Sequence, residues 1–212
     1  MSNGAFGQTV SSEDELQSLL GSTPSKLAAN KVITELDEHC RDFLAKSPFV
    51  VVSTSDASGS CDVSPRGDAP GFVRVLDENR LVIPERPGNK RADSLRNILN
   101  NPRIGLIFLI PGLEETLRIN GRACIVRDPD VLEPMSAQGK APTLGIGVEV
   151  EECFVHCAKA LKRSKLWQPE SWASRDQLPN PAQMLRDHCK LPGLTTEDIA
   201  QSLQESYTKR LY

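Results

Sequence analysis

The chain has 212 residues, which is enough for one folded domain with additional helices. Its 25 basic and 28 acidic residues give a formal net charge of −3. This charge argues against a globally basic nucleic-acid-binding protein but is compatible with a local basic site. Apolar residues make up 39% and charged residues 25% of the sequence, as in folded proteins rather than disordered or membrane-spanning ones. The longest apolar run, residues 104–110, is too short to cross a bilayer.

The first 16 residues lack the basic and apolar regions of a secretory signal, so we expect a cytoplasmic protein. Six scattered cysteines without a C-x-x-C pair are weak evidence for disulfides in that compartment. Cys153, His156 and Cys157 are close in sequence, but in a strand His156 points away from both cysteines. We therefore expect neither a metal site nor a Cys157 nucleophile there.

Helices are expected before and after the central part of the chain, where apolar residues recur with helical spacing between capping residues. These helices cover residues 11–21, 32–46, 182–190 and 195–211, the last with Thr195 as N-cap. We expect three parts: an N-terminal helical segment (1–47), a central domain (48–168) and a C-terminal helical tail packed on that domain (169–212).

The central domain is typical of β-strands interrupted by one helix. The expected strands cover residues 49–55, 60–64, 72–76, 80–84, 103–111, 115–127 and 146–156. Residues 65–71 are expected as a loop, and residues 89–101 as the helix, which Pro102 ends. The connections are too short for repeated crossover helices, so we expect a mainly β domain in which a meander of six or seven antiparallel strands forms a barrel with flanking helices.

Burial can also be predicted for two of these strands. The segment 103–111 has no polar alternation, so both of its faces are expected to be buried. In the last strand we expect Ile146, Val148, Val150 and Phe154 to point inward.

The start of the expected helix is the first candidate site. Asn89 is a good N-cap, which would place Lys90 and Arg91 in the first turn, where the helix dipole opposes cations. A phosphate bound by these side chains and by backbone N–H groups would explain the arrangement. Residues 84–103 also carry five basic and two acidic residues, a local charge of +3. We favour an anion site over the alternative, a solvated basic turn.

Two further clusters are less specific. Ser64, Arg66 and Gly67 lie in a Pro- and Gly-rich segment whose backbone could approach a planar ligand, although Arg66 and Asp68 could simply pair with each other. Residues 159–165 contain four cations and no acid, which usually indicates a solvated helix face and less often a second anion contact. Serine-hydrolase, P-loop and dinucleotide-binding glycine motifs are absent from the sequence.

The segment from VSPRGDAPGF to ETLRINGRA (residues 63–123) resembles the pyridoxamine 5′-phosphate oxidase-like flavoproteins, the FMN-binding split-barrel family. The similarity extends over roughly residues 32–168, and FVHCAKALKRSKLW (154–167) matches one branch of the family. The resemblance implies a six-stranded split barrel in a homodimer, with FMN between the subunits and a small-molecule substrate. It implies neither a nucleic-acid nor a membrane partner.

The resemblance also implies cofactor contacts. Lys90 and Arg91 match the basic pair that binds the FMN phosphate, with Asn89 beside them. The strand backbone at Ile83 and Pro84 is expected to pass the flavin. The remaining expected contacts are Ser64, Arg66, Gly67 and Thr116 near the ring, and His156, Lys159 and Arg163 reaching the other subunit's flavin.

One departure from the family bears on the activity. The true oxidase has a late Arg-x-His pair that binds pyridoxal phosphate, and this chain has none. The resemblance therefore implies an FMN-dependent oxidoreductase with another substrate and leaves the catalytic residues unassigned. The alternative is a non-catalytic module that binds flavin, haem or a deazaflavin, because relatives on this fold differ in activity.

Overall fold

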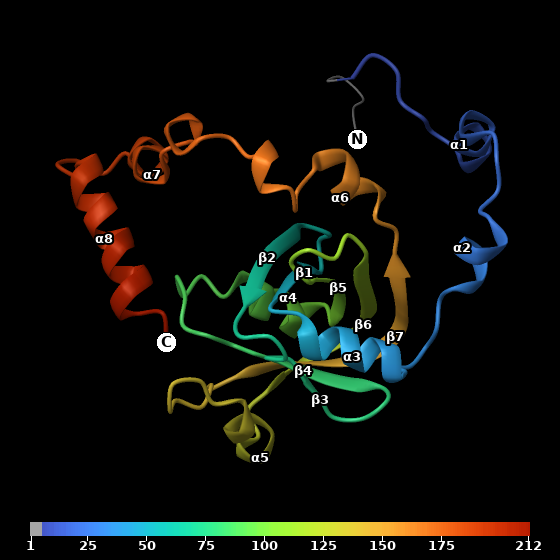
Figure 1. Cartoon of the computed structure of the whole chain (residues 1–212), viewed down its shortest axis with the longest axis horizontal. Helices are drawn as coiled ribbons and strands as arrows, with labels where there is room; N and C mark the ends of the chain where they lie inside the picture. Colours follow the sequence, from blue (N-terminus) through green and yellow to red (C-terminus); the bar gives the residue numbers. More distant parts are fainter. Residues whose placement is uncertain (1–5) are drawn as a thin grey trace. The chain divides into compact units, whose positions relative to one another are not determined.

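A computed structural model of the chain describes residues 6–212 (Figure 1). The chain forms two compact units, Met1–Val32 and Ile33–Tyr212. The first unit contains α1 (Glu13–Leu20) and α2 (Lys26–Asn30). The Ser12 side chain caps α1 by accepting a hydrogen bond from the Glu15 N–H, and Gly21 ends the helix in a left-handed conformation. These caps confirm the helix expected over residues 11–21.

The second unit is built on one antiparallel sheet in the order β2-β1-β5-β6-β7-β4-β3. Its strands are β1 (Phe49–Ser55), β2 (Cys61–Gly67), β3 (Arg74–Val75), β4 (Arg80–Pro84), β5 (Arg103–Leu109), β6 (Thr116–Val126) and β7 (Gly145–His156). The mainly β, antiparallel class is as expected. The expected split barrel had six strands, and this number is wrong: the structure has one seven-stranded sheet that is not closed, with β2 and β3 at its edges.

Three helix or strand boundaries differ from the prediction for local reasons. The helix expected from residue 32 begins later, as α3 (Glu38–Lys46), because Asp37 caps it and Ile33 instead pairs with β7. The helix expected from Asn89 is α4 (Asp93–Asn100). The loop expected from Pro65 begins after Gly67, since β2 is an edge strand on which proline is tolerated.

The core lies on the inner face of the sheet, where Phe108, Leu117 and Ile119 are fully buried. Strand β5 alternates, with Ile107 39% exposed on its outer face, so the prediction that both faces are buried is wrong.

A bulge between Asn120 and Gly121 shifts the β6–β7 register by one residue. Cys153 therefore points inward in place of Phe154, whose ring instead lies under the Arg118 guanidinium at 5.1 Å.

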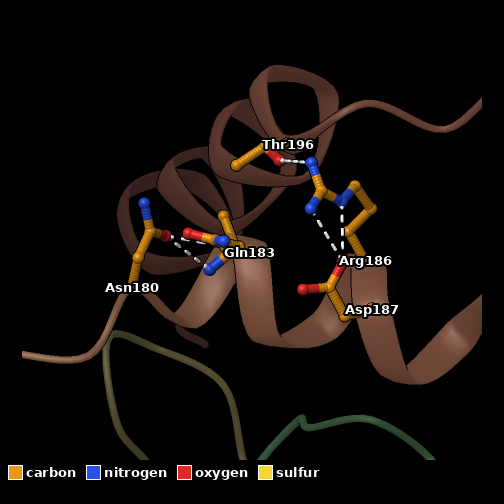
Figure 2. Close-up of polar contacts among 6 residues, drawn as sticks. Asn180, Gln183, Arg186, Asp187 and Thr196 are labelled. Carbon is orange, nitrogen blue, oxygen red and sulfur yellow. Dashed lines mark hydrogen bonds and ion pairs between the residues drawn. The ribbon is translucent and has the colours of Figure 1, made fainter.

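The remaining elements are short, except for the last two helices. They are α5 (Pro129–Leu132), η1 (Glu133–Met135), α6 (Lys159–Ser164), η2 (Pro169–Ser171), η3 (Arg175–Gln177), α7 (Pro181–Cys189) and α8 (Thr196–Lys209). Thr195 caps α8 as expected, and α7 packs against α8. Figure 2 shows Arg186 donating to the Thr196 hydroxyl at 2.9 Å while it pairs with Asp187. In residues 6–212, no helix has the length and apolar character needed to cross a membrane.

The bulge leads to a prediction about stability. A Cβ atom at Gly121 would lie 2.0 Å from the Glu149 carbonyl oxygen, which belongs to the paired backbone of β7 and cannot move aside. We expect Gly121→Ala to lower the free energy of unfolding by about 3 kcal/mol or more. In the control Gly105→Ala, the new Cβ would be 3.4 Å from the Asn120 side chain, an ordinary contact. Urea unfolding would contradict the prediction if both variants were equally stable.

Candidate functional site

The inner row of β2 lies beside the segment that follows β4. Asp62, Ser64 and Arg66 alternate with exposed residues and are each half-buried. Arg66 forms an ion pair with Glu85, and the Ser94 hydroxyl donates to Asp62 Oδ2 at 2.7 Å. Residues 85–94 are therefore held to β2 at both ends of the segment. We call this region, residues 62–66 of β2 with residues 85–94, the β2 seam.

Arg66 is the buried cation of the seam. Its side chain is 15% exposed and its Nη1 contacts the Glu85 carboxylate. Its Nε–H is buried and has no hydrogen-bond partner within the described residues. A buried donor left without an acceptor costs about 1–3 kcal/mol, so this N–H is suited to an acceptor atom of a ligand.

The turn before α4 has an unusual backbone. Lys90 and Ala92 are left-handed, with φ of 59° and 57°. The Asn89 side chain accepts a hydrogen bond from the Arg91 N–H at 3.0 Å, a local turn that competes with the helix. The expected Asn89 N-cap is therefore wrong: Ala92 occupies that position and makes no side-chain cap. When left-handed residues alternate with right-handed ones, successive backbone N–H groups can point toward one anion. Residues in such strained conformations are also concentrated at functional sites.

The two cations of this turn differ in their partners. Arg91 forms a 2.8 Å ion pair with Asp93, and this hydrogen bond and charge raise the pKa of its guanidinium, with a further contribution from Asp62. Lys90 is exposed and has no ion pair within the part of the chain that the structure describes. Lys90 is therefore the freer of the two to bind an incoming anion.

The end of β4 brings backbone, not side chains, to the seam. Ile83 is 1% exposed and packs in the core, and Pro84 is also buried. Both pair with the start of β7, at Ile146 and Gly145. A ligand in the seam could therefore meet only their main chain.

Arg86, next to Glu85 in the seam, belongs to a second charge cluster that fixes the loop after β2. Asp68 accepts a 2.6 Å hydrogen bond from Arg86, which also donates to the Met135 carbonyl. The Tyr212 hydroxyl donates to the other Asp68 oxygen at 2.6 Å. The suggested Arg66–Asp68 pair is thus wrong, because each residue pairs with a charge that follows β4.

Thr116 and His156 lie on other strands. They are register partners at the ends of β6 and β7. Lys159 and Arg163 follow on α6 and are exposed. This helix is held to the β5–β6 turn by a Lys162–Glu114 ion pair and by Trp167, whose Nε1 donates to the Leu113 carbonyl at 2.9 Å.

These residues lie on other strands than the β2 seam. Gly67 pairs with Phe49 on β1, which pairs with Leu109 on β5, so β6 and β7 are the third and fourth strands from β2 in the order of the sheet. The segment after β4, in contrast, reaches β2 through the Arg66–Glu85 ion pair. The structure therefore gathers Ser64, Arg66, Gly67, Ile83, Pro84, Asn89, Lys90 and Arg91 in one group, and Thr116, His156, Lys159 and Arg163 in another.

Sequence reasoning missed several residues that shape the seam. Glu85, Asp62 and Ser94 make its polar contacts, and only their positions on the folded sheet reveal this. Tyr212 lies 144 residues from Asp68, and no sequence signal connects them.

Two further features lie outside the seam. A depression of about 260 Å³ over β1, β5 and β6 contains none of the expected cofactor contacts. Within residues 6–212, no group of three or more His, Cys, Asp or Glu side chains is placed to bind a metal ion.

The stability contributed by the Asp68 carboxyl depends on pH. Burial raises the pKa of this carboxyl, whereas hydrogen bonds from Tyr212, the Ala69 N–H and Arg86, together with the Arg86 charge, lower it. The net effect is a pKa below the ordinary 3.8. A lowered folded-state pKa stabilises the fold above about pH 3.8, and this contribution is lost as the pH falls through the folded-state value.

We expect Asp68→Asn to lower the free energy of unfolding at neutral pH by about 3 kcal/mol, because it leaves the Arg86 charge buried without a counter-ion. The difference from the wild type should shrink at a pH below the lowered folded-state pKa of Asp68, where the wild-type carboxyl is protonated. Urea unfolding at both pH values checks this. Asp42→Asn, which breaks an exposed pair with Lys46, is the control and should cost about 0.5 kcal/mol or less. An equal Asp68→Asn deficit at both pH values would contradict the assignment.

Among solved structures, HupZ of Group A Streptococcus is 19% identical, with a TM-score of 0.47 over 56% of this chain and 92% of that one. A Lactobacillus delbrueckii protein assigned as a pyridoxamine 5′-phosphate oxidase is 22% identical, with a TM-score of 0.47 over 58% and 98%. An FMN-binding protein of Syntrophomonas wolfei is 9% identical, with a TM-score of 0.41 over 55% and 88%.

No curated protein matches the chain significantly. The family model described as pyridoxamine 5′-phosphate oxidase matches residues 36–157, which is more than half of the chain. The matched region includes every strand of the sheet and the expected cofactor contacts of both groups up to His156. The chain therefore belongs to the pyridoxamine 5′-phosphate oxidase family.

Proposed function

We propose that the chain binds FMN in the β2 seam and is an FMN-dependent oxidoreductase that acts on a small substrate. The observation that carries this proposal is the buried Arg66 Nε–H, which has no acceptor within the described residues. The flavin ring system presents carbonyl oxygens and ring nitrogens as acceptors. A cofactor of this type would satisfy the donor at the place where the family resemblance puts the ring.

The turn at residues 89–92 supplies positive charge and N–H donors for the FMN phosphate. Lys90 is an exposed cation without an ion pair among the described residues, and Arg91 follows it. The left-handed backbone at Lys90 and Ala92 and the uncapped start of α4 add N–H donors beside these charges. Asn89 holds the turn through its bond to the Arg91 N–H. This donor set fits a phosphate dianion in an otherwise acidic protein.

The ring would lie between the end of β2 and the end of β4. Here Ser64 offers a hydroxyl and Ile83 and Pro84 offer main-chain atoms, since their side chains are buried. Gly67 is exposed at the end of β2, and a Cβ atom there would lie 3.2 Å from the Pro48 carbonyl oxygen, so glycine fits this position without a shift of the backbone.

When bound, FMN supplies hydride and electron transfer, and the protein binds and orients it. Arg66 would hold the ring edge through Nε while Glu85 fixes its guanidinium plane. Lys90 and Arg91 would fix the opposite end of the cofactor. No side chain is assigned here as an acid or base, and pyridoxamine phosphate is not proposed as substrate because the Arg-x-His pair is missing.

The second group of residues supports a homodimer with FMN between subunits. Thr116 and His156 lie on β6 and β7, three and four strands from β2 in the order of the sheet, and Lys159 and Arg163 follow on α6. In a twofold-symmetric dimer every contact between the subunits occurs twice. The four residues of one subunit can therefore approach the β2 seam of the other subunit, and the reverse contact forms as well. We propose that each cofactor site is completed in this way.

The phosphate contact can be tested with two ligands that differ only in that group. We expect the wild type to bind FMN about 100-fold more tightly than riboflavin, and Lys90→Ala/Arg91→Ala to remove most of that difference. Two charge-assisted contacts account for about 3 kcal/mol of this effect. Quenching of flavin fluorescence on titration gives both dissociation constants, and an absorbance spectrum of the purified protein shows any cofactor retained.

The matched control is Lys46→Ala/Lys209→Ala, which removes two positive charges from exposed i,i+4 pairs. This control should keep the preference for FMN over riboflavin. A double variant at 90 and 91 that still prefers FMN would contradict the phosphate site. A protein that takes up no FMN at all would contradict the function, and titration with haem and a deazaflavin would then follow.

A further inference from the structure

Two cysteines far apart in the sequence meet in the core. The Sγ atoms of Cys40 on α3 and Cys153 on β7 are 3.2 Å apart, although 113 residues separate them. Cys153 is 0% exposed and Cys40 is 5% exposed. The other four cysteines, Cys61, Cys124, Cys157 and Cys189, are exposed and free. The buried pair is thus distinct from the rest in both contact and burial.

The backbone around the pair is fixed on both sides. The Cys40 N–H donates to the Asp37 side chain at 2.8 Å, which anchors the first turn of α3. The Cys153 N–H and carbonyl both bond to Ile33, at 2.7 and 3.0 Å, so the segment leading into α3 is paired with β7. A disulfide needs sulfurs about 2.05 Å apart, so they would have to approach by roughly 1.2 Å. Side-chain rotation and a small helix shift can supply that movement.

We propose that Cys40 and Cys153 are an oxidative modification site, at which a peroxide converts the two thiols to a disulfide that links α3 to β7. The two thiols lose two electrons and two protons as the S–S bond forms. The peroxide O–O bond breaks, and hydrogen peroxide leaves as two water molecules. The site is independent of the proposed cofactor, so the protein without FMN can be tested.

The order of the steps follows from the surroundings of each sulfur. The hydrogen bond to Cys40, burial and nearby negative charge raise the pKa of the Cys153 thiol, so Cys153 stays protonated. Cys40, the slightly more exposed sulfur, is the one that peroxide oxidises first, to a sulfenic acid. The Cys153 sulfur then forms the S–S bond with that sulfur as its S–O bond breaks, and the thiol proton of Cys153 leaves with the hydroxyl as water. Burial makes this oxidation slower than that of an exposed thiolate.

The bond would join parts of the fold that the sheet alone does not join. Cys153 is three residues before His156 on β7, and α3 leads into β1. Oxidation would therefore stiffen the end of the sheet that carries Thr116 and His156. A cross-link across so many residues restricts the unfolded chain strongly.

The test uses a full-length variant in which Cys61, Cys124, Cys157 and Cys189 are replaced by Ser. After treatment with hydrogen peroxide, we expect the denatured protein to have lost both remaining thiols, its mass to fall by about 2 Da, and a peptide joining Cys40 to Cys153 to appear. The midpoint of thermal unfolding should rise by roughly 5–10 °C and return to its starting value with dithiothreitol.

The same background with Cys40→Ser is the control and should show no cross-linked peptide and no reversible thermal shift. Two thiols that persist in the folded protein, while the urea-unfolded protein is oxidised, would overturn the proposal. A gain in mass from sulfinic acid without a cross-link would also overturn it. If the fourfold variant does not fold, wild-type protein whose exposed thiols are first alkylated answers the same question.

Discussion

The pairing of β6 with β7 is the constraint on which the rest of the unit depends. Strand β7 pairs with β6 from Gly145 to His156 and, over its first half, with β4 on its other side. Its start therefore sets where β4 ends and where the segment of the β2 seam begins. Its end sets the position of His156 beside Thr116. One strand thus places both groups of expected cofactor contacts, and Gly121 allows the bulge that lets β6 follow it.

The charges of the seam explain how an acidic chain can present a site for an anion. Arg66 and Arg86 are buried cations that are each balanced by a carboxylate, Glu85 and Asp68. These pairs hold the loops in place but leave little net charge to attract a ligand. Lys90 is exposed on a left-handed turn and has no ion pair within residues 6–212. Structural stabilisation and ligand recognition are therefore assigned to different cations, Arg66 and Arg86 for the first and Lys90 for the second.

The sequence predicted the antiparallel sheet, its strands and the capped tail helices because alternation and capping are local patterns. It could not predict features set by partners far along the chain. The bulge at Gly121 reverses Phe154 and Cys153, and no local pattern indicates it. The predicted start of α4 was wrong because asparagine can either cap a helix or stabilise a turn. Here the Asn89 side chain accepts a hydrogen bond from the Arg91 N–H in a turn, and the helix starts later. For the seam, the motif located Arg66 and Lys90, but the Glu85 and Asp68 pairings required the folded sheet.

The contact between Tyr212 and Asp68 bears on how the protein is made. The sheet is complete at His156, 56 residues before Tyr212 (212 − 156), so all seven strands leave the ribosome before the tyrosine is added. Domains fold as units during synthesis, from the N-terminus onward. The nascent sheet must therefore hold the Asp68 loop without the tyrosine, through Arg86, the Ala69 N–H and the backbone bond from Asp68 to Pro48, and the phenol joins a structure that already exists. The tail thus locks a loop that it takes no part in building.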